Sequence, residues 1–221
     1  MGKTILFVQQ KGGAGKTMLL TQLAAHYAGL GASVTLIDLD PQRSTTAWFA
    51  QRAAGAAGME LMESAEWRAG SDMRDAARKA DWVFIDAPGS ADVLGRGAMR
   101  EADFALIPCQ PAMADVWATA ATLAMAAKEK LAHAVILNRF PPRGRAAEAA
   151  AAALAANGAP LLTPRIGARA AFAEAFMQGA GVTETARNSK AAVEIAALAA
   201  ALEAALAYKV PSGAMLTAGS I

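Results

Sequence analysis

The sequence contains a single cysteine, Cys109, among 221 residues. One cysteine excludes an internal disulfide framework and a cysteine-cluster metal site within one chain. The sequence also lacks a run of the roughly 18–20 strongly apolar residues that a membrane-spanning helix needs. The best candidate, residues 191–208, is mostly alanine and contains Glu194 and Glu203. We therefore do not expect a membrane-embedded protein.

Charge is scarce in this chain. Charged residues make up 18% of it, below the roughly 25% usual for soluble domains, and 21 Lys and Arg against 19 Asp and Glu leave a net charge of +2. This balance alone does not argue for a nucleic-acid partner. The N-terminus passes directly into a strand pattern without the basic and apolar regions of a secretory signal, so we expect a cytoplasmic protein.

Short apolar runs alternate with longer amphipathic stretches, which is typical of parallel strands joined by helices. The runs ILFV, VTLI, VFI and AVIL suit strands that helices bury on both faces. We predict strands at residues 4–10, 33–38, 82–86, 104–108 and 134–138, with weaker candidates at 59–62 and 160–162. We predict helices at residues 16–28, 44–54, 71–79, 113–130, 145–156 and 189–208. We therefore expect one α/β domain at 1–209, with a mostly parallel central sheet flanked by helices, and a flexible tail at 210–221.

The stretch from Lys11 to Thr17, K-G-G-A-G-K-T, follows the first predicted strand and opens the first predicted helix. In this context glycines let successive backbone N–H groups turn toward phosphate oxygens, and the helix N-terminus adds a favourable dipole. Lys16 offers a charge for the β- and γ-phosphates, and Thr17 offers a hydroxyl for Mg²⁺. The strict G-x-x-x-x-G-K-[ST] pattern is not met, because Gln10 stands at the first glycine position. The alternative is a glycine-rich turn that binds no ligand.

Polar side chains end three of the predicted strands. Asp38 and Asp40 stand in the segment D-L-D-P-Q, where alternation places them on the same side of an extended chain, near the edge where nucleotides sit. Asp86 ends the run W-V-F-I-D, the Walker B arrangement, in which the acid holds Mg²⁺ through a water. Asn138 ends A-V-I-L-N, and an amide can donate and accept at once. The alternatives are capping carboxylates for Asp38 and Asp40 and a turn residue for Asn138.

These segments together resemble the ParA/MinD group of P-loop ATPases with a deviant Walker A box, over roughly residues 1–208. Short ParA-type partition or cargo-positioning ATPases are the most similar. The resemblance implies ATP and Mg²⁺ as cofactors, with slow hydrolysis of ATP to ADP and phosphate in the absence of a partner. It implies that Lys11 reaches the partner's ATP in a nucleotide-sandwich dimer. It also implies that Asp40 positions the attacking water.

The resemblance also distributes the remaining roles at the site. The residues implied to be catalytic are Lys11, Lys16 and Asp40, and those implied to support the metal are Thr17, Asp38 and Asp86. Those implied to bind the nucleotide are Gly12, Gly13, Ala14, Gly15, Lys16, Thr17, Met18, Asn138 and Pro164. Within this set Asn138 is expected to contact the adenine, and the backbone near Pro164 is expected to border the base. Met18 departs from the group, which often has a second threonine at this position.

Members of the group differ in what they bind. DNA-binding members use scattered basic residues late in the chain, and the candidates here are Arg165, Arg169, Arg187 and Lys190. Such residues bind the phosphates of DNA without recognising its base sequence. A basic amphipathic C-terminal helix for membrane attachment is not expected, because residues 211–217 carry no charge.

The resemblance therefore implies an ATP-dependent homodimer, non-specific DNA and a ParB-like or adaptor protein that stimulates hydrolysis, with no membrane partner. The cargo is a plasmid, a chromosome or a protein assembly, and the ATP state is expected on the nucleoid. The alternative is a metabolic ATP-dependent ligase of the dethiobiotin synthetase type on the same fold. That alternative predicts a second, small-molecule pocket.

Overall fold

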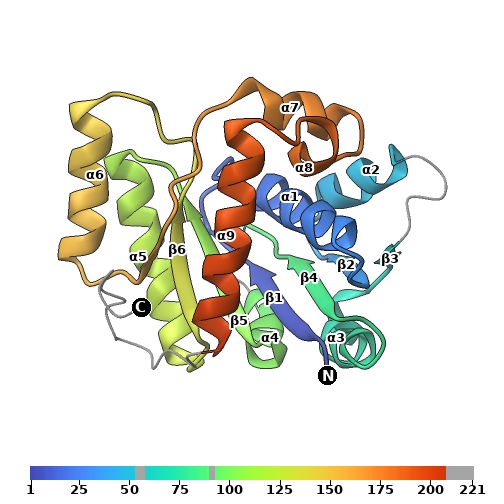
Figure 1. Ribbon diagram of the computed structural model, residues 1–221. Coiled ribbons are helices and arrows are strands. Elements are labelled where there is room, and N and C mark those ends of the chain that lie inside the picture. Colours follow the sequence, from blue (N-terminus) through green and yellow to red (C-terminus); the bar gives the residue numbers. More distant parts are fainter. Residues whose placement is uncertain (53–57, 90–92, 208–221) are drawn as a thin grey trace.

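The computed structural model describes residues 1–52, 58–89 and 93–207, and its centre is a seven-stranded parallel sheet (Figure 1). The strands lie in the order β3-β2-β4-β1-β5-β6-β7. Their bounds are β1 Lys3–Phe7, β2 Val34–Asp38, β3 Met59–Met62, β4 Trp82–Asp86, β5 Phe104–Cys109, β6 His133–Leu137 and β7 Leu161–Leu162. Every predicted strand is formed, including the two weaker candidates, so the predicted α/β fold is confirmed. The expected tail at 210–221 lies outside the described residues.

Helices cover both faces of the sheet. Their bounds are α1 Lys16–Gly29, α2 Ser44–Ala50, α3 Ala69–Ala77, α4 Val93–Glu101, α5 Met113–Lys128, α6 Arg145–Ala156, α7 Ala170–Met177, α8 Val182–Thr185 and α9 Lys190–Ala207. The six predicted helices correspond to α1, α2, α3, α5, α6 and α9. The sequence did not predict α4, α7 and α8. Two glycines weaken the helical pattern of α4, while α7 has only 8 residues and α8 only 4.

The alternation of apolar side chains along the buried strands divides the interior into two cores. In β1, Ile5 and Phe7 point toward α1, α2, α7, α8 and α9, whereas Leu6 and the following Val8 point toward α3, α4, α5 and α6. This two-sided burial explains why the strands read as continuous apolar runs. Among the described residues, no helix has the length and apolar character needed to cross a bilayer.

The strand order brings the candidate site residues to one edge. β1 lies between β4 and β5, and β4 lies between β1 and β2. Phe7 and Asp38, the last residues of β1 and β2, are both in register with Asp86, the last residue of β4. The three strands therefore end at the same level. The loops that follow them open at one carboxyl edge, where open α/β sheets bind ligands.

Candidate functional site

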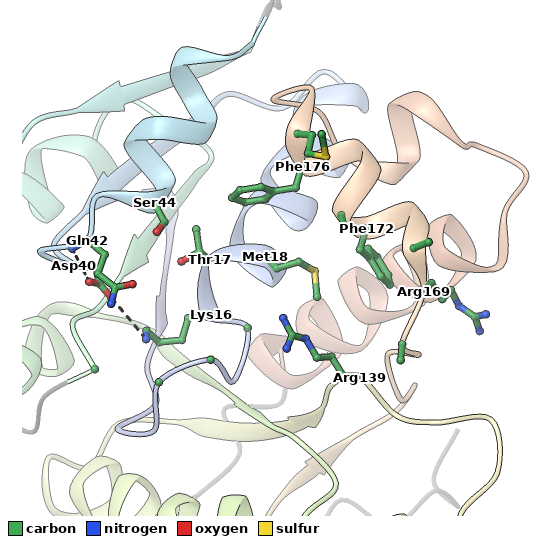
Figure 2. Close-up of a pocket in the computed structure, with 18 of the residues that line it drawn as sticks. Lys16, Thr17, Met18, Asp40, Gln42, Ser44, Arg139, Arg169, Phe172 and Phe176 are labelled. Atoms are coloured by element: carbon green, nitrogen blue, oxygen red, sulfur yellow. Dashed lines mark hydrogen bonds and ion pairs between the residues drawn. The ribbon is translucent and has the colours of Figure 1, made fainter.

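The glycine-rich loop after β1 forms one wall of a cavity of about 770 Å³ (Figure 2). Gly13 and Gly15 have φ angles of 79° and 100°, which a residue with a Cβ adopts only with strain. The helix α1 begins immediately afterwards, at Lys16. The loop thus presents backbone and a helix N-terminus to the cavity, an arrangement that binds phosphate. Of the predicted loop residues, Gly12, Gly13, Gly15, Lys16, Thr17 and Met18 line the cavity, and Ala14 does not.

Lys16 and Asp40 face each other in this cavity, although 24 residues of sequence separate them. The Lys16 Nζ atom lies 3.8 Å from Asp40 Oδ2, and the two side chains are only 9% and 15% exposed. The other Asp40 oxygen accepts a hydrogen bond of 3.0 Å from the backbone N–H of Gln42. The structure therefore brings together two of the residues expected to be catalytic. The long contact leaves the ammonium group of Lys16 free to donate hydrogen bonds to an anion in the cavity.

Asp86 at the end of β4 is completely buried. Its Oδ2 atom accepts hydrogen bonds from the hydroxyls of Thr17, at 2.7 Å, and Thr45, at 2.8 Å. Its Oδ1 atom has no hydrogen-bond partner among the described residues. Burial raises the pKa of Asp86 to about 6, although the hydroxyls of Thr17 and Thr45 and the charge of Lys16 lower it. Because Thr45 follows no recognised pattern, the sequence did not predict its role here.

The free carboxylate oxygen of Asp86 beside the Thr17 hydroxyl fits a Mg²⁺ site. Mg²⁺ prefers oxygen ligands and in nucleotide sites takes one or two from the protein, the remainder coming from phosphates and water. An uncompensated carboxylate in a buried place is costly, and a divalent cation would remove that cost. The residues expected to support the metal, Thr17 and Asp86, are therefore adjacent.

Asp38, also expected near the metal, has a different environment. It is 2% exposed, and its Oδ2 atom accepts hydrogen bonds from the backbone N–H and the hydroxyl of Thr46, at 2.9 and 2.8 Å. Its Oδ1 atom accepts the N–H of Asp40 at 3.2 Å. Asp38 thus connects the first turn of α2 to the carboxyl end of β2. A contribution of Asp38 to the metal site stays a prediction.

Lys11 is bound within its own chain. Its ammonium group forms an ion pair with Asp115 in the first turn of α5; the side chains are 39% and 5% exposed. The amide of Gln110 also donates a hydrogen bond of 2.7 Å to the carbonyl of Gly13. Lys11 is not among the residues that line the cavity. The structure therefore separates the two lysines of the loop, and action of Lys11 on a partner's nucleotide stays a prediction.

The far wall of the cavity includes Arg169, which was expected to bind DNA, together with residues for which the sequence analysis made no prediction. Arg139, Phe172 and Phe176 line it. The two phenylalanines come from α7, and because α7 was not predicted, they were not expected to share a face. Asn138 and Pro164, expected beside the base, are not among the lining residues, although Gly167 and Ala168 are. Contacts of Asn138 and Pro164 with a base stay predictions.

The four basic residues suggested for DNA fall into two pairs. Arg165 forms an ion pair of 2.7 Å with Glu148, and Arg169 forms one with Glu194, in which the Nε–Oε2 distance is 3.0 Å. Arg187 and Lys190 are exposed, and neither forms an ion pair within the described part of the chain. They lie just before α9 and at its first residue. Of these four residues, Arg187 and Lys190 are therefore the two whose charges no ion pair within the described residues engages.

Comparison with known proteins places this site among nucleotide-binding domains. The family model of the CobQ/CobB/MinD/ParA nucleotide-binding domain matches residues 5–182. The maintenance of carboxysome distribution protein A of Halothiobacillus neapolitanus is 32% identical over 200 residues, which cover 87% of this chain and 92% of that protein. The protein ParA of Rhizobium radiobacter is 29% identical over 183 residues, with coverage of 79% and 82%.

Two solved structures share the fold. The ATP complex of McdA from Cyanothece has a TM-score of 0.76 at 18% identity, covering 91% of this chain and 96% of that chain. MinD from Pyrococcus horikoshii, complexed with Mg-ADP, has a TM-score of 0.77 at 19% identity, with coverage of 95% and 99%. Each of these two relatives was therefore solved with an adenine nucleotide bound.

Proposed function

Because this chain belongs to the CobQ/CobB/MinD/ParA family and is a ParA/MinD-family ATPase, we propose that it partitions or positions a cargo in the manner of ParA. In this proposal ATP joins two copies into a sandwich dimer, and the dimer binds DNA without sequence preference. A partner protein then stimulates hydrolysis of ATP to ADP and phosphate, and the dimer releases DNA. The cargo is a plasmid, a chromosome or a protein assembly, and no membrane is involved.

The observation that carries the proposal is the presence of two lysines in one phosphate loop with different surroundings. Lys16 points into the cavity toward Asp40, as an ordinary phosphate-loop lysine does. Lys11 stands outside the cavity and pairs with Asp115. A second lysine that does not line its own cavity would be available to another copy once its ion pair with Asp115 opens. Charge that develops on the γ-phosphate during hydrolysis is stabilised by each additional cation placed against it.

Residues that line the cavity, together with the buried Asp86 that is hydrogen-bonded to Thr17, would support hydrolysis in simple steps. Lys16 and the backbone N–H groups of the loop would hold the β- and γ-phosphates, and Asp40 would orient a water toward the γ-phosphorus. Thr17 and Asp86 would hold Mg²⁺, which neutralises phosphate charge when bound. Asp40 accepts a hydrogen bond from Gln42 through only one of its oxygens, so its other oxygen is available to the water. Orientation of the water is the main demand, because phosphoryl transfer depends on positioning and charge.

DNA binding is supported by Arg187 and Lys190, which are exposed beside the start of α9. Two such residues per chain give four cations in a dimer, and binding through phosphate contacts of this kind weakens steeply as salt is raised. The names of the relatives also point to cargo positioning, since one maintains carboxysome distribution and the other is a ParA. The ion pairs of Arg165 and Arg169 with glutamates make them weaker candidates than the resemblance implied.

The proposal is tested by sedimentation of the protein with ATP or ADP, with and without a DNA duplex of arbitrary sequence. We expect dimerisation and DNA binding in ATP only, and we expect both to be lost in Lys11→Ala. Lys79→Ala, which removes an exposed lysine next to α3, is the matched control and should behave as the wild type. A wild-type protein that stays monomeric in ATP and ignores DNA would refute the proposal and favour the ligase alternative.

A further inference from the structure

The buried face of α5 carries three polar side chains. They belong to Asp115, Thr119 and Thr122, and the other two buried residues of the helix are apolar. The three follow one another at spacings of four and three residues, which places them on one face of the helix. A buried polar group costs free energy unless it is hydrogen-bonded. Each of the three finds a partner on the segment that leads from β1 into the phosphate loop.

Gln9, two residues after β1, is at the centre of these contacts and is only 1% exposed. Its Nε2 atom donates to the carbonyl of Pro108 at 3.0 Å and to the hydroxyl of Thr119 at 2.9 Å. Its Oε1 atom accepts the hydroxyl of Thr122 at 3.1 Å and the backbone N–H of Lys11 at 3.4 Å. A side-chain amide has two N–H donors and two acceptor lone pairs. Every hydrogen-bonding position of the Gln9 side chain is therefore used.

These hydrogen bonds replace the sheet ladder at the point where the chain leaves it. The backbone stays bonded to β5 as far as the N–H of Val8, at 3.3 Å. Continuing this parallel ladder by two residues would pair the N–H of Gln10 with the carbonyl of Pro108. That carbonyl instead accepts the Gln9 amide, and the N–H of Gln10 donates to the Thr122 hydroxyl at 3.4 Å. The start of the phosphate loop is thus attached to β5 and α5 by side chains.

Lys11 is connected to the same face of α5 in two ways. Its backbone N–H donates to Gln9, and its ammonium group pairs with Asp115. The backbone carbonyl of Asp115 accepts the hydroxyl of Thr119 at 2.8 Å, and Thr119 also accepts the Gln9 amide. The backbone of Lys11 and the carboxylate that binds its side chain are therefore joined through one buried network.

The later part of the phosphate loop is attached elsewhere. The carbonyl of Gly13 accepts a hydrogen bond of 2.7 Å from the side chain of Gln110, and that of Ala14 accepts one of 2.8 Å from the side chain of Asn138. Neither donor belongs to α5. A change at Gln9 therefore acts first on Lys11, and the residues of the loop that line the cavity keep their own attachments.

We infer that Gln9 is a positioning residue for Lys11 and acts through the polar face of α5. It fixes the backbone at the point where Lys11 emerges, and so determines which groups the ammonium can reach. In the free chain the ammonium reaches Asp115. In the sandwich dimer of the proposed function, on which this last step rests, Gln9 holds the same backbone while the ammonium leaves Asp115 for the partner's nucleotide.

Limited acetylation of the ligand-free full chain with acetic anhydride measures the position of Lys11, with the rate at each lysine determined by mass spectrometry. Acetylation of Lys11 requires its amine to leave Asp115. The variant Gln9→Met has a side chain of similar length that forms none of the four hydrogen bonds, and we expect it to raise the rate at Lys11 several-fold. Asp115→Asn should raise the rate in the wild-type chain and add little in Gln9→Met, because both changes free the same amine.

Two other lysines are internal controls. Lys16 is 8% exposed and belongs to the later part of the loop, whereas Lys79 is exposed, and both should react in Gln9→Met as in the wild type. Thr122→Val is measured in parallel in case Gln9→Met does not fold, because it replaces the hydroxyl with an apolar group of the same shape. It should also raise the rate at Lys11, whereas Thr122→Ser, which keeps the hydroxyl, should not.

Three results would overturn the inference. The first is an unchanged rate at Lys11 in Gln9→Met and Thr122→Val. The second is a rise at Lys16 together with Lys11, which would mean that Gln9 supports the fold of the whole loop. The third is that the effects of Gln9→Met and Asp115→Asn multiply, which would mean that they act on Lys11 separately.

Dimerisation in ATP, measured by sedimentation, tests the last step. Gln9→Met should need a several-fold higher protein concentration for half-dimerisation, because the backbone that carries Lys11 toward the partner is no longer fixed. An unchanged concentration would show that Gln9 positions Lys11 in the free chain only and would overturn the step in the dimer. A wild-type protein that stays monomeric in ATP would refute the proposed function instead, and the acetylation rates would still decide the role of Gln9.

Discussion

Replacing Asp86 with asparagine removes a buried carboxylate whose ionisation the folded protein resists. Burial raises the pKa of Asp86 from its ordinary value of 3.8 to about 6. The folded chain therefore holds a proton between these two pH values that the unfolded chain has already lost. Stability falls with rising pH wherever the native state binds more protons than the unfolded state. In the ligand-free protein, the contribution of Asp86 to the free energy of unfolding is thus lowest above pH 6. The substitution Asp86→Asn removes this dependence of stability on pH.

The magnitude follows from the size of the shift. One pKa unit corresponds to about 1.4 kcal/mol, so the rise from 3.8 to about 6 corresponds to about 3 kcal/mol. The asparagine variant should gain this amount relative to the wild type between pH 4 and pH 7. Its carbonyl oxygen can still accept the hydroxyls of Thr17 and Thr45, so these hydrogen bonds are kept. We expect this gain in stability to be accompanied by a loss of Mg²⁺-dependent nucleotide binding, because an amide NH₂ group takes the place of the free Oδ1 oxygen.

Urea unfolding at a series of pH values, without Mg²⁺ or nucleotide, measures the difference directly. The free energy of unfolding of Asp86→Asn minus that of the wild type should rise from pH 4 to pH 7. Asp75→Asn, which changes an aspartate that is half exposed, is the control for the chemical substitution itself. A difference between Asp86→Asn and the wild type that does not vary with pH would refute the reasoning. It would mean that the interior of the site solvates the carboxylate despite its burial.

Three further variants test ion pairs. Asp115→Asn removes the carboxylate that binds Lys11. We therefore expect sedimentation to show half-dimerisation in ATP at a several-fold lower protein concentration. An unchanged or higher concentration would show that the ion pair does not restrain Lys11. Arg52→Met breaks the pair with Glu184, whose side chains are 7% and 30% exposed, and we expect a loss of about 2 kcal/mol in urea unfolding. Arg78→Met, at an exposed pair, should cost less than about 0.5 kcal/mol, and equal losses would contradict the role of burial.

The sheet could be predicted because its strands are simple. The strands β1, β2, β4, β5 and β6 are mostly apolar and almost fully buried, and strands that helices cover on both faces are rich in apolar residues. The phosphate loop and Asp86 could be predicted for a similar reason, since the chemistry of phosphate and Mg²⁺ limits the residues at those places. The helix α7 could not, because its 8 residues A-A-F-A-E-A-F-M are too short for a clear period.

Partners within the site depend on contacts between distant segments, which the sequence does not record. Lys11 meets Asp115 across 104 positions, and Asn138 meets Ala14 across 124. A motif gives the type of residue at a position but not the direction in which its side chain points. For this reason the sequence predicted an amide at Asn138 but not its hydrogen bond to the carbonyl of Ala14.

The oxygen Oδ2 of Asp86 is shared by two helices. It accepts a hydroxyl from Thr17 in the first turn of α1 and a hydroxyl from Thr45 in the first turn of α2. The next residue of α2, Thr46, is bound in turn to Asp38 at the end of the neighbouring strand. The start of α2 is thus attached to the sheet through consecutive threonines, and one of these attachments passes through the carboxylate that faces the metal site. A change in the hydrogen bonds of that single oxygen therefore alters a contact of α1 and a contact of α2 together, which couples the starts of the two helices.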